Sequence, residues 1–203
     1  TRNAFAMMVS AGFTAPHEGK KLPSTTYRLS TSCARQSVFN AEVPGSRPTL
    51  VGTDPTRDLI DMASGTQNEI YGLDVKGDMI DAVFGLNMER AIVKNMTIDP
   101  PVFNGISIEQ KTGYGSLPSS TFVHIEGNTI IGAGDNGIKV ASFIYDEDGA
   151  HTQTVIIDHN VANYNGNNGI DVVNAVSGTG TAFTQAVQIT YNTANGNGST
   201  GII

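Results

Sequence analysis

The chain has 203 residues, of which 39% are hydrophobic and only 15% are charged, and it contains 23 glycines. This composition is too apolar for a solvated disordered chain and too rich in glycine for a helical bundle. The formal net charge of −7 disfavours nucleic acid or an anionic membrane as a partner, and no apolar stretch approaches the ~20 residues that cross a bilayer. Because Cys33 is the sole cysteine, the sequence excludes an internal disulfide and a cysteine-based metal site.

The first residues of the chain differ from the rest. Residues 3–12 are compatible with a short helix, with Asn3 as its N-cap, and residues 22–29 predict a turn that enters a strand. An uncovered end of a stack of strands is a template for aggregation. We therefore interpret residues 1–26 as an N-terminal cap with a short helix.

The remainder of the chain is a repeat. An Asn-Gly-Ile unit begins at Asn104, and the same unit recurs at Asn136 and Asn168, 32 residues further on each time. Within the units, apolar and polar residues alternate, as in residues 123–126 and 138–140. This period of two predicts β-strands with one buried face.

Identical offsets in successive units indicate coils of a solenoid. A single coil cannot bury its inner face, whereas stacking coils ~4.8 Å apart buries that face and pairs the backbone. We therefore predict an all-β fold, a single-stranded parallel β-helix over residues 27–203. The general preference of parallel crossovers makes it right-handed.

The coils differ in length along the chain. Units that begin at Asp58 and Asp81 precede Asn104 with a step of 23 residues rather than 32. The extra residues fall at one offset in three consecutive coils. We predict that they form inserted loops, stacked as a wall along one flank of the solenoid, at residues 109–120, 141–152 and 173–184.

Several segments also resemble a known superfamily. The run LPSTTYRL at residues 22–29 and the repeats GNTIIGAGDNGIKV and HNVANYNGNNGIDVV resemble the right-handed β-helices of the pectate-lyase-like superfamily, which includes polysaccharide lyases, mannuronan epimerases and phage tailspikes. The resemblance implies a polysaccharide partner and a secreted, cell-surface or virion location. The epimerase run Asp-Pro-His-Glu is absent, since Asp99-Pro100-Pro101 lacks the histidine and the acid.

Two groups of residues are candidates for acid–base catalysis. Glu126 and Asp158 share one offset of the 32-residue repeat, so we expect them one coil apart, where each carboxylate raises the pKa of the other. Asp146 and Asp148, with His151 close by, offer an acid and a base or oxygen ligands for Ca²⁺. The alternative for both groups is ordinary solvated polar residues, outward on a strand or at a loop tip.

Other residues are candidates for sugar binding. Lys139 and Asp171 share an offset and predict an exposed ion pair. Tyr114 and Tyr145 lie in the inserted segments and Tyr164 on a nearby turn, where aromatic faces stack on pyranose rings. Loop packing is the alternative for such aromatic residues.

The remaining polar columns have structural interpretations. Asn128, Asn160 and Asn192 share an offset, and we expect them to satisfy turn backbone at the corners of the solenoid. His124 and His159 are interpreted as exposed strand and corner residues, because no histidine pair has metal-ligand spacing.

These observations favour a protein that binds a polysaccharide and processes it as a lyase, hydrolase or epimerase, with Ca²⁺ as the candidate cofactor and no assigned metal site. The alternative is a non-enzymatic solenoid, such as an adhesin, an autotransporter passenger or a segment of a phage fibre. We expect neither nucleic acid nor membrane insertion. We also expect the C-terminal coil to be continued by further chain or covered by another subunit.

Overall fold

The computed structural model describes residues 27–29, 37–40, 49–62, 65–114, 116–145 and 149–203. Strands are the regular elements of these residues, which contain no helix, and so none that could span a membrane. The predicted cap and its helix, at residues 1–26, lie outside the described residues.

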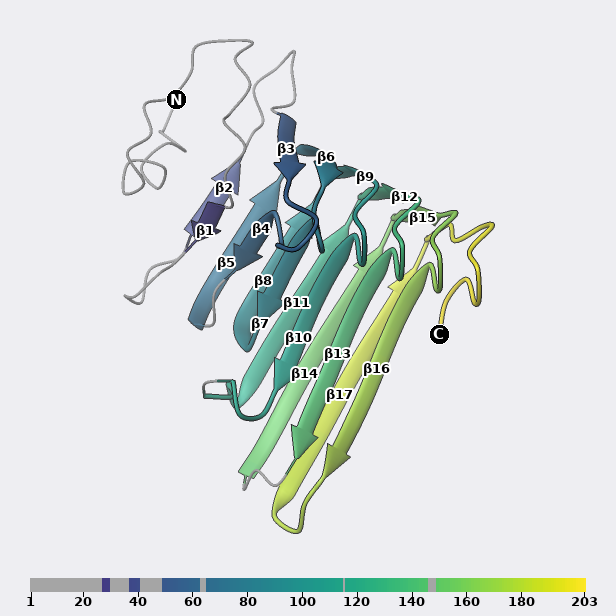
Figure 1. Ribbon diagram of the computed structural model, residues 1–203. Helices are drawn as coiled ribbons and strands as arrows, with labels where there is room; N and C mark the ends of the chain where they lie inside the picture. The colour runs from purple at the N-terminus through teal and green to yellow at the C-terminus, as the bar shows by residue number, and fades with distance from the viewer. Residues whose placement is uncertain (1–26, 30–36, 41–48, 63–64, 115, 146–148) are drawn as a thin grey trace.

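The strands form three parallel sheets, which we name A, B and C (Figure 1). Sheet A contains, in spatial order, β1 (Tyr27–Leu29), β4 (Ile60–Met62), β7 (Val83–Leu86), β10 (Ile106–Lys111), β13 (Ile138–Tyr145) and β16 (Ile170–Ser177). Sheet B contains β2 (Ser37–Asn40), β5 (Gly65–Tyr71), β8 (Met88–Lys94), β11 (Ser120–Glu126), β14 (Gly149–Asp158) and β17 (Thr181–Thr190). Sheet C contains β3 (Thr49–Thr53), β6 (Asp74–Asp78), β9 (Thr97–Asp99), β12 (Thr129–Ile131) and β15 (Val161–Asn163).

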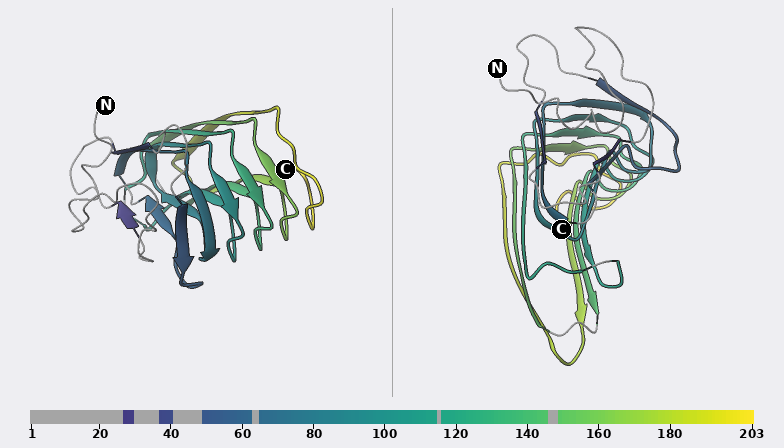
Figure 2. Two further views of the ribbon diagram at one scale, coloured as in Figure 1. Left: turned by 90° about the horizontal axis from the view of Figure 1, so that it is seen from above. Right: turned by 90° about the vertical axis from the view of Figure 1, so that its left-hand side faces the viewer.

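The chain passes through sheets A, B and C in turn and then repeats this path one strand further along each sheet. Successive coils therefore stack along one axis from the N-terminal to the C-terminal side, as Figure 2 shows in its left view. Strands that follow one another by a whole coil pair in parallel, which is the arrangement of a parallel β-helix.

The predicted register is confirmed. Ile106 pairs with Ile138 and Ile138 with Ile170, and all three side chains are fully buried. Ile60 and Val83 continue this column through the shorter coils. The inward residues of the three sheets thus form one continuous apolar core, as the alternation in the sequence requires.

Ladders of asparagine hold the corners of the coils. At the corner before sheet A, Asn104 Oδ1 accepts a hydrogen bond from the Asn136 backbone N–H at 3.3 Å, and Asn136 Oδ1 accepts one from Asn168 N–H at 3.2 Å. At the corner after sheet B, Asn128 N–H donates to Asn160 Oδ1 at 2.9 Å, and Asn160 N–H donates to Asn192 Oδ1 at 2.8 Å. These amides satisfy backbone groups that the turns leave unpaired, as expected.

Aspartate replaces asparagine in the shorter coils. Asp81 Oδ1 accepts from the Asn104 backbone N–H at 2.8 Å, and Asp58 Oδ1 accepts from Asp81 N–H at 3.2 Å. Burial raises the pKa of Asp81 to about 6 and also raises the pKa of Asp58, and the charges of neighbouring acids add to both shifts. The N-terminal part of this ladder therefore carries carboxyl groups that bind protons tightly.

The inserted segments are strands rather than the predicted loops. β13 and β14 together cover most of residues 141–152, and β16 and β17 cover most of residues 173–184; only the first insert keeps a longer connection between β10 and β11. The extra residues lengthen sheets A and B. The two sheets continue past the body of the helix as a thin projection, which Figure 2 shows in its right view.

Polar side chains fill the base of this projection. Gln110 Nε2 donates to Thr121 Oγ1, Ser142 Oγ donates to Gln153 Oε1 at 3.3 Å, and Gln185 Nε2 donates to Gln153 Oε1 at 2.6 Å. We call these five residues the amide column. Each member from the first two long coils is buried, so the column separates the apolar core of the helix from the projection.

Candidate functional site

A group of charged side chains lies on the outer face of sheet B, near the ends of β8, β11 and β14. The parallel register places Glu126 between Lys94 on one side and Asp158 on the other. The prediction that Glu126 and Asp158 are neighbours one coil apart is thus confirmed.

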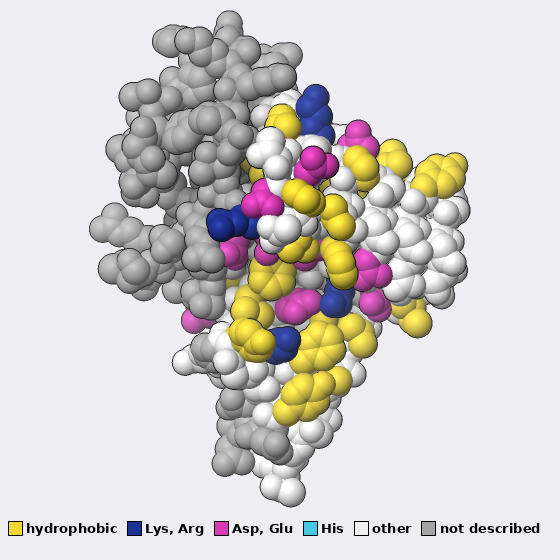
Figure 3. Space-filling model, in the orientation of Figure 1, with side chains coloured by type: hydrophobic (Ala, Val, Ile, Leu, Met, Phe, Trp, Pro, Cys, Tyr) yellow, Lys and Arg dark blue, Asp and Glu magenta, His cyan; other side chains and the backbone are white. Residues whose placement is uncertain are grey.

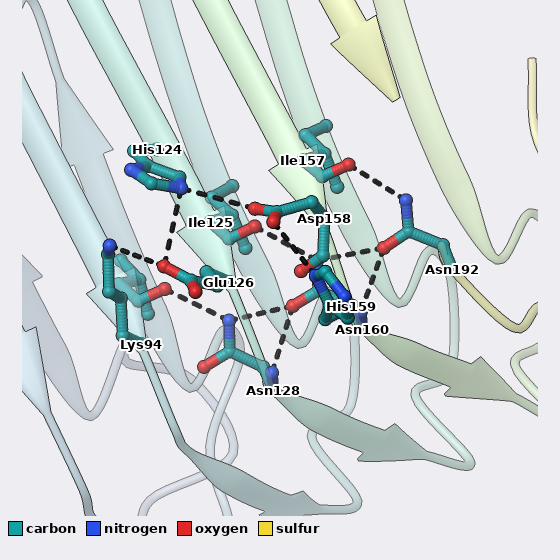
Figure 4. A network of polar contacts seen from close by, with 11 residues as sticks. Lys94, His124, Ile125, Glu126, Asn128, Ile157, Asp158, His159, Asn160 and Asn192 are labelled. Carbon is teal, nitrogen blue, oxygen red and sulfur yellow. Dashed lines mark hydrogen bonds and ion pairs between the residues drawn. The ribbon is translucent and has the colours of Figure 1, made fainter. Parts of the chain in front are cut away.

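The contacts of this group form a continuous chain (Figure 4). His124 Nε2 lies 3.1 Å from Asp158 Oδ1 and 3.4 Å from Glu126 Oε2. Lys94 Nζ forms an ion pair with Glu126 Oε2, and His159 Nδ1 lies 2.9 Å from Asp158 Oδ2. We call these five residues the polar cluster.

The pKa of Asp158 does not follow the expectation from paired carboxylates. Burial raises this pKa, but the hydrogen bonds from His159 and His124 outweigh burial, and the net pKa lies below its ordinary value. The expected rise is therefore wrong for Asp158, because imidazole groups and not Glu126 are its nearest partners.

Buried and partly exposed residues alternate along β11, so the cluster residues on this strand point outward. Val123 and Ile125 are fully buried, so His124 and Glu126 point away from the core. The corner amide of Asn160 donates to the Ile125 carbonyl at 2.9 Å, beside Glu126 in the chain. Cluster residues therefore lie next to backbone that is held by the core and the corner ladder.

One further aromatic ring, that of Tyr191, extends the cluster. His159 and Tyr191 stack with ring centroids 4.9 Å apart, and both residues have a φ of 55°. Gly127 occupies the same position one coil earlier, with a φ of 66°. A bulky residue in this left-handed region is strained, and such strain concentrates at functional sites. The Tyr191 side chain is 80% exposed, which leaves its ring open to a ligand.

The outward side of sheet B carries further charged and aromatic side chains toward the N-terminal coils. The Arg90 guanidinium lies 5.0 Å from the Phe122 ring centroid, and its Nε lies 3.2 Å from Glu69 Oε1. The Tyr71 hydroxyl donates to Glu69 Oε2 at 3.0 Å. Burial and this hydrogen bond raise the pKa of Tyr71 to about 12, so the hydroxyl keeps its proton at neutral pH. We call the outward side of sheet B, with the cluster on it, the B face.

The predicted sugar-binding residues lie elsewhere. Lys139, Asp171 and Tyr145 point outward from sheet A, whose inner side faces sheet B, so they lie on the side opposite the polar cluster. Lys139 Nζ pairs with Glu109 Oε1 at 2.9 Å rather than with Asp171, which corrects the predicted ion pair. Burial raises the pKa of Asp171, and the charge of Lys139 partly offsets this rise.

Sheet A faces the reader in Figure 3, where basic and acidic side chains lie among hydrophobic ones. Tyr114 follows β10 on this side, with Lys111 Nζ 4.6 Å from its ring centroid. Tyr164 lies at the turn after β15, is exposed and has a φ of 57°. Neither tyrosine contacts the cluster residues in the interactions that the structure shows.

Of the second predicted acid–base group, the described residues include His151 alone. His151 points into the projection, is buried, and has Nδ1 3.3 Å from the Pro118 carbonyl oxygen. Its Nε2 is buried without a hydrogen-bond partner. His151 is therefore not solvated, because its position on β14 has inward parity with Gln153, and its role as an acid or base stays a prediction. Asp146 and Asp148 lie outside the described residues.

The cluster combines groups that transfer protons and groups that bind metals. The ligand atoms of His124, Glu126 and Asp158 all lie within 4.8 Å of one another. Paired carboxylates ~5–5.5 Å apart are typical of retaining glycoside hydrolases, and ~6.5–9.5 Å is typical of inverting ones. An imidazole nitrogen and two carboxylates also form a common set of ligands for a divalent ion.

Sequence reasoning missed Lys94, His124 and His159. The signal for His124 was available, because it lies two residues before Glu126 on an alternating strand and so shares its face. The 32-residue step places Lys94 beside Glu126 in the same way. His159 required the corner geometry, which the repeat alone does not specify.

In comparisons with known proteins, no family model, no curated protein and no solved structure matches the chain. The parallel β-helix therefore stands on the structure, and membership of the pectate-lyase-like superfamily stays a prediction.

Proposed function

We propose that this protein binds a polysaccharide along the B face and processes it at the polar cluster. The observation that carries the proposal is the convergence of His124, Glu126 and Asp158, which come from two neighbouring strands and have ligand atoms within 4.8 Å. General acid–base catalysis needs a proton donor and a proton acceptor within hydrogen-bond reach of the reacting atoms, and this convergence brings both kinds of group to one point.

The form of the B face supports a chain-like ligand. Parallel strands ~4.8 Å apart present side chains at regular intervals, so several sugar residues have room along the stack. Tyr191 stacks on His159 at the edge of the cluster, and Phe122 provides another ring on the adjacent coil. Aromatic faces pack on the apolar faces of sugar rings, and charged groups beside them bind the hydroxyls.

The cluster offers a donor and an acceptor of protons. Asp158 is the candidate acceptor because its two imidazole contacts favour the ionised carboxylate. His124 faces both carboxylates and is the candidate donor. Lys94 holds Glu126 beside His124 and adds positive charge for a developing oxyanion.

The charge of the chain favours a glycan with few acidic groups. A net charge of −7 repels a polyanion such as pectate unless cations bridge the two. We place this activity outside the cell or on a virion, where polysaccharides are accessible.

A polysaccharide panel tests the proposal. We expect new reducing ends or unsaturated products from at least one neutral or weakly acidic glycan, and a loss of rate of ~100-fold or more in Asp158→Asn and His124→Ala. Asp171→Asn is the matched control, since Asp171 is an outward carboxylate on sheet A, and it should leave the rate unchanged.

Two outcomes would overturn the enzymatic part of the proposal. One is the absence of product from every glycan, and the other is an unchanged rate in Asp158→Asn. If a glycan binds without turnover and Tyr191→Ala weakens that binding, the non-enzymatic interpretation as an adhesin, autotransporter passenger or phage-fibre segment replaces it.

A further inference from the structure

We propose that the polar cluster binds one divalent first-row transition-metal ion, such as Zn²⁺, through His124, Glu126 and Asp158. This inference goes beyond the proposed function and needs no glycan, because it concerns the free protein. His124 Nε2 cannot hold an ion and donate a proton at once, so the ion replaces the donor role proposed above for His124. It rests on the positions of three ligand atoms, on their chemistry and on the side chains that contact them.

The distances fit an ion with little movement. Zn²⁺ lies ~2.0–2.2 Å from nitrogen and oxygen ligands, so two ligands of a tetrahedral site are ~3.4 Å apart. His124 Nε2 lies 3.1 Å from Asp158 Oδ1 and 3.4 Å from Glu126 Oε2, which matches two edges of such a tetrahedron. The third edge joins the two carboxylates, whose oxygens are within 4.8 Å, and side-chain rotation can close it.

The arrangement of charges also favours a cation at this point. Two carboxylates face one imidazole nitrogen, yet a neutral imidazole can donate only one hydrogen bond from that atom. A divalent ion in place of that proton would contact His124, Glu126 and Asp158 at once. Three protein ligands would leave a fourth position for water or a sugar oxygen, which is the pattern of catalytic rather than structural zinc sites.

The ligand types select the kind of ion. Imidazole nitrogen suits zinc, copper, iron and nickel, whereas Ca²⁺ takes six to eight oxygen ligands and Mg²⁺ retains several waters. A site with one nitrogen and two carboxylates is therefore better suited to a transition metal than to the Ca²⁺ that the sequence suggested for residues 146–151.

Outer contacts fix the ligands as in known metal sites. His159 Nδ1 holds Asp158 Oδ2, the oxygen that does not face His124. Lys94 contacts Glu126 Oε2, the oxygen that also faces His124, so the carboxylate must turn its second oxygen toward the lysine before Oε2 can hold an ion. Ile92 and Ile156 flank His124 on the neighbouring strands and limit the movement of its ring.

The cluster is partly buried and still accessible from solvent. The side chains of His124 and Asp158 are 20% and 18% exposed, and that of Glu126 is 38% exposed. An ion can therefore enter without a change of fold, and its ligands are drawn from a sheet whose inner side is packed core.

Calorimetric titration of the metal-free protein with Zn²⁺ tests the proposal directly. The protein is first stripped with a chelator and then dialysed free of it. We expect one ion per chain with a Kd below ~10 µM. In a parallel titration, Co²⁺ should produce visible absorption bands of a tetrahedral or five-coordinate site, and Zn²⁺ should abolish them.

Variants locate the ion. His124→Ala and the isosteric Asp158→Asn should each weaken binding by ~100-fold or more, and His159→Ala by the ~10-fold typical of outer contacts. Glu109→Gln is the control, because Glu109 is a paired carboxylate on sheet A. The affinity of this variant for Zn²⁺ should equal that of the unaltered chain. Circular dichroism establishes that each variant is folded.

The proposal is overturned if Zn²⁺ does not bind, or if it binds equally well to His124→Ala and Asp158→Asn. Both results are independent of the polysaccharide panel. Metal binding with no sugar product leaves the site in place and removes the enzyme, whereas product formed at full rate after chelation leaves the enzyme and removes the ion from its reaction.

Discussion

Coils with a step of 23 residues and coils with a step of 32 residues build the same helix with different corners. At the corner before sheet A, the shorter coils place Asp58 and Asp81 where the longer coils place asparagine. At the corner after sheet B, the residue that precedes Asn128 by one coil is Met96, which is buried. The backbone follows the same path in both regions while the chemistry that holds it changes.

The difference shows that the corner needs an oxygen acceptor before sheet A and tolerates an apolar residue after sheet B. Asp81 and Asn136 both accept a backbone hydrogen bond from the adjacent coil, but only Asp81 adds a buried charge. The ladder residues of the longer coils are neutral, so the contribution of this ladder to stability should depend less on pH there than in the shorter coils.

The largest expected effect comes from breaking the corner ladder of the longer coils. Asn160 donates to the Ile125 carbonyl and accepts from the Asn128 backbone N–H. Asn160→Ala leaves these buried groups unpaired, and we expect a loss of about 3–5 kcal/mol in the free energy of unfolding. Urea denaturation measures the loss. The control Asn163→Ala, which removes one exposed hydrogen bond, should cost less than about 1 kcal/mol.

The next prediction replaces Asp81 by asparagine, the residue that the longer coils have at this corner. Because the pKa of Asp81 is raised from 3.8 to about 6, the folded chain binds this proton more tightly than the unfolded chain. The resulting stability is present below pH ~4 and is lost as the pH rises through about 6. Asp81→Asn should therefore stabilise the protein at pH 7, by about 3 kcal/mol at most.

Denaturation at several pH values checks this prediction. The advantage of Asp81→Asn over the unaltered chain should shrink as the pH falls from 7 to 4. Asp135→Asn, which changes a carboxylate beside the ladder, controls for net charge. A constant difference at all pH values would show that Asp81 is not the group that titrates.

The smallest effect concerns the amide column, which the longer coils add. Ser142 Oγ donates to Gln153 Oε1 at 3.3 Å between sheets A and B. Ser142→Ala should cost about 1 kcal/mol, because Gln185 also donates to Gln153 and keeps its oxygen paired. Thr154→Ala is the control, since Thr154 is exposed on the outer side of sheet B. Equal losses in the two variants would contradict a role of the column in joining the sheets.

Much of the fold was predictable because the repeat carries its own register. The offset of 32 residues correctly paired Ile106 with Ile138 and Glu126 with Asp158. The inserted strands were missed because polar residues at inward positions, such as Ser142 and Gln153, interrupt the apolar alternation that marks a strand. Their partners across the two sheets are visible only in three dimensions.

The candidate site was predictable in part for the same reason. Neighbours within sheet B follow from the register, but the register does not show that the outer sides of sheets A and B lie on opposite surfaces of the molecule. Lys139 and Glu126 are close in sequence, yet they belong to different sheets that turn their outer sides away from each other. The stacked pair of His159 and Tyr191 depends on left-handed corners, for which glycine is the usual residue.

The equal step of the longer coils has a consequence for how such a protein can change in length. Each contact between β11, β14 and β17 is repeated with the same register, so a duplicated block of 32 residues would meet matching neighbours on both sides. The molecule can thus grow or shrink by whole units while the polar cluster, which needs the single pair of His124 and Asp158, remains one per chain.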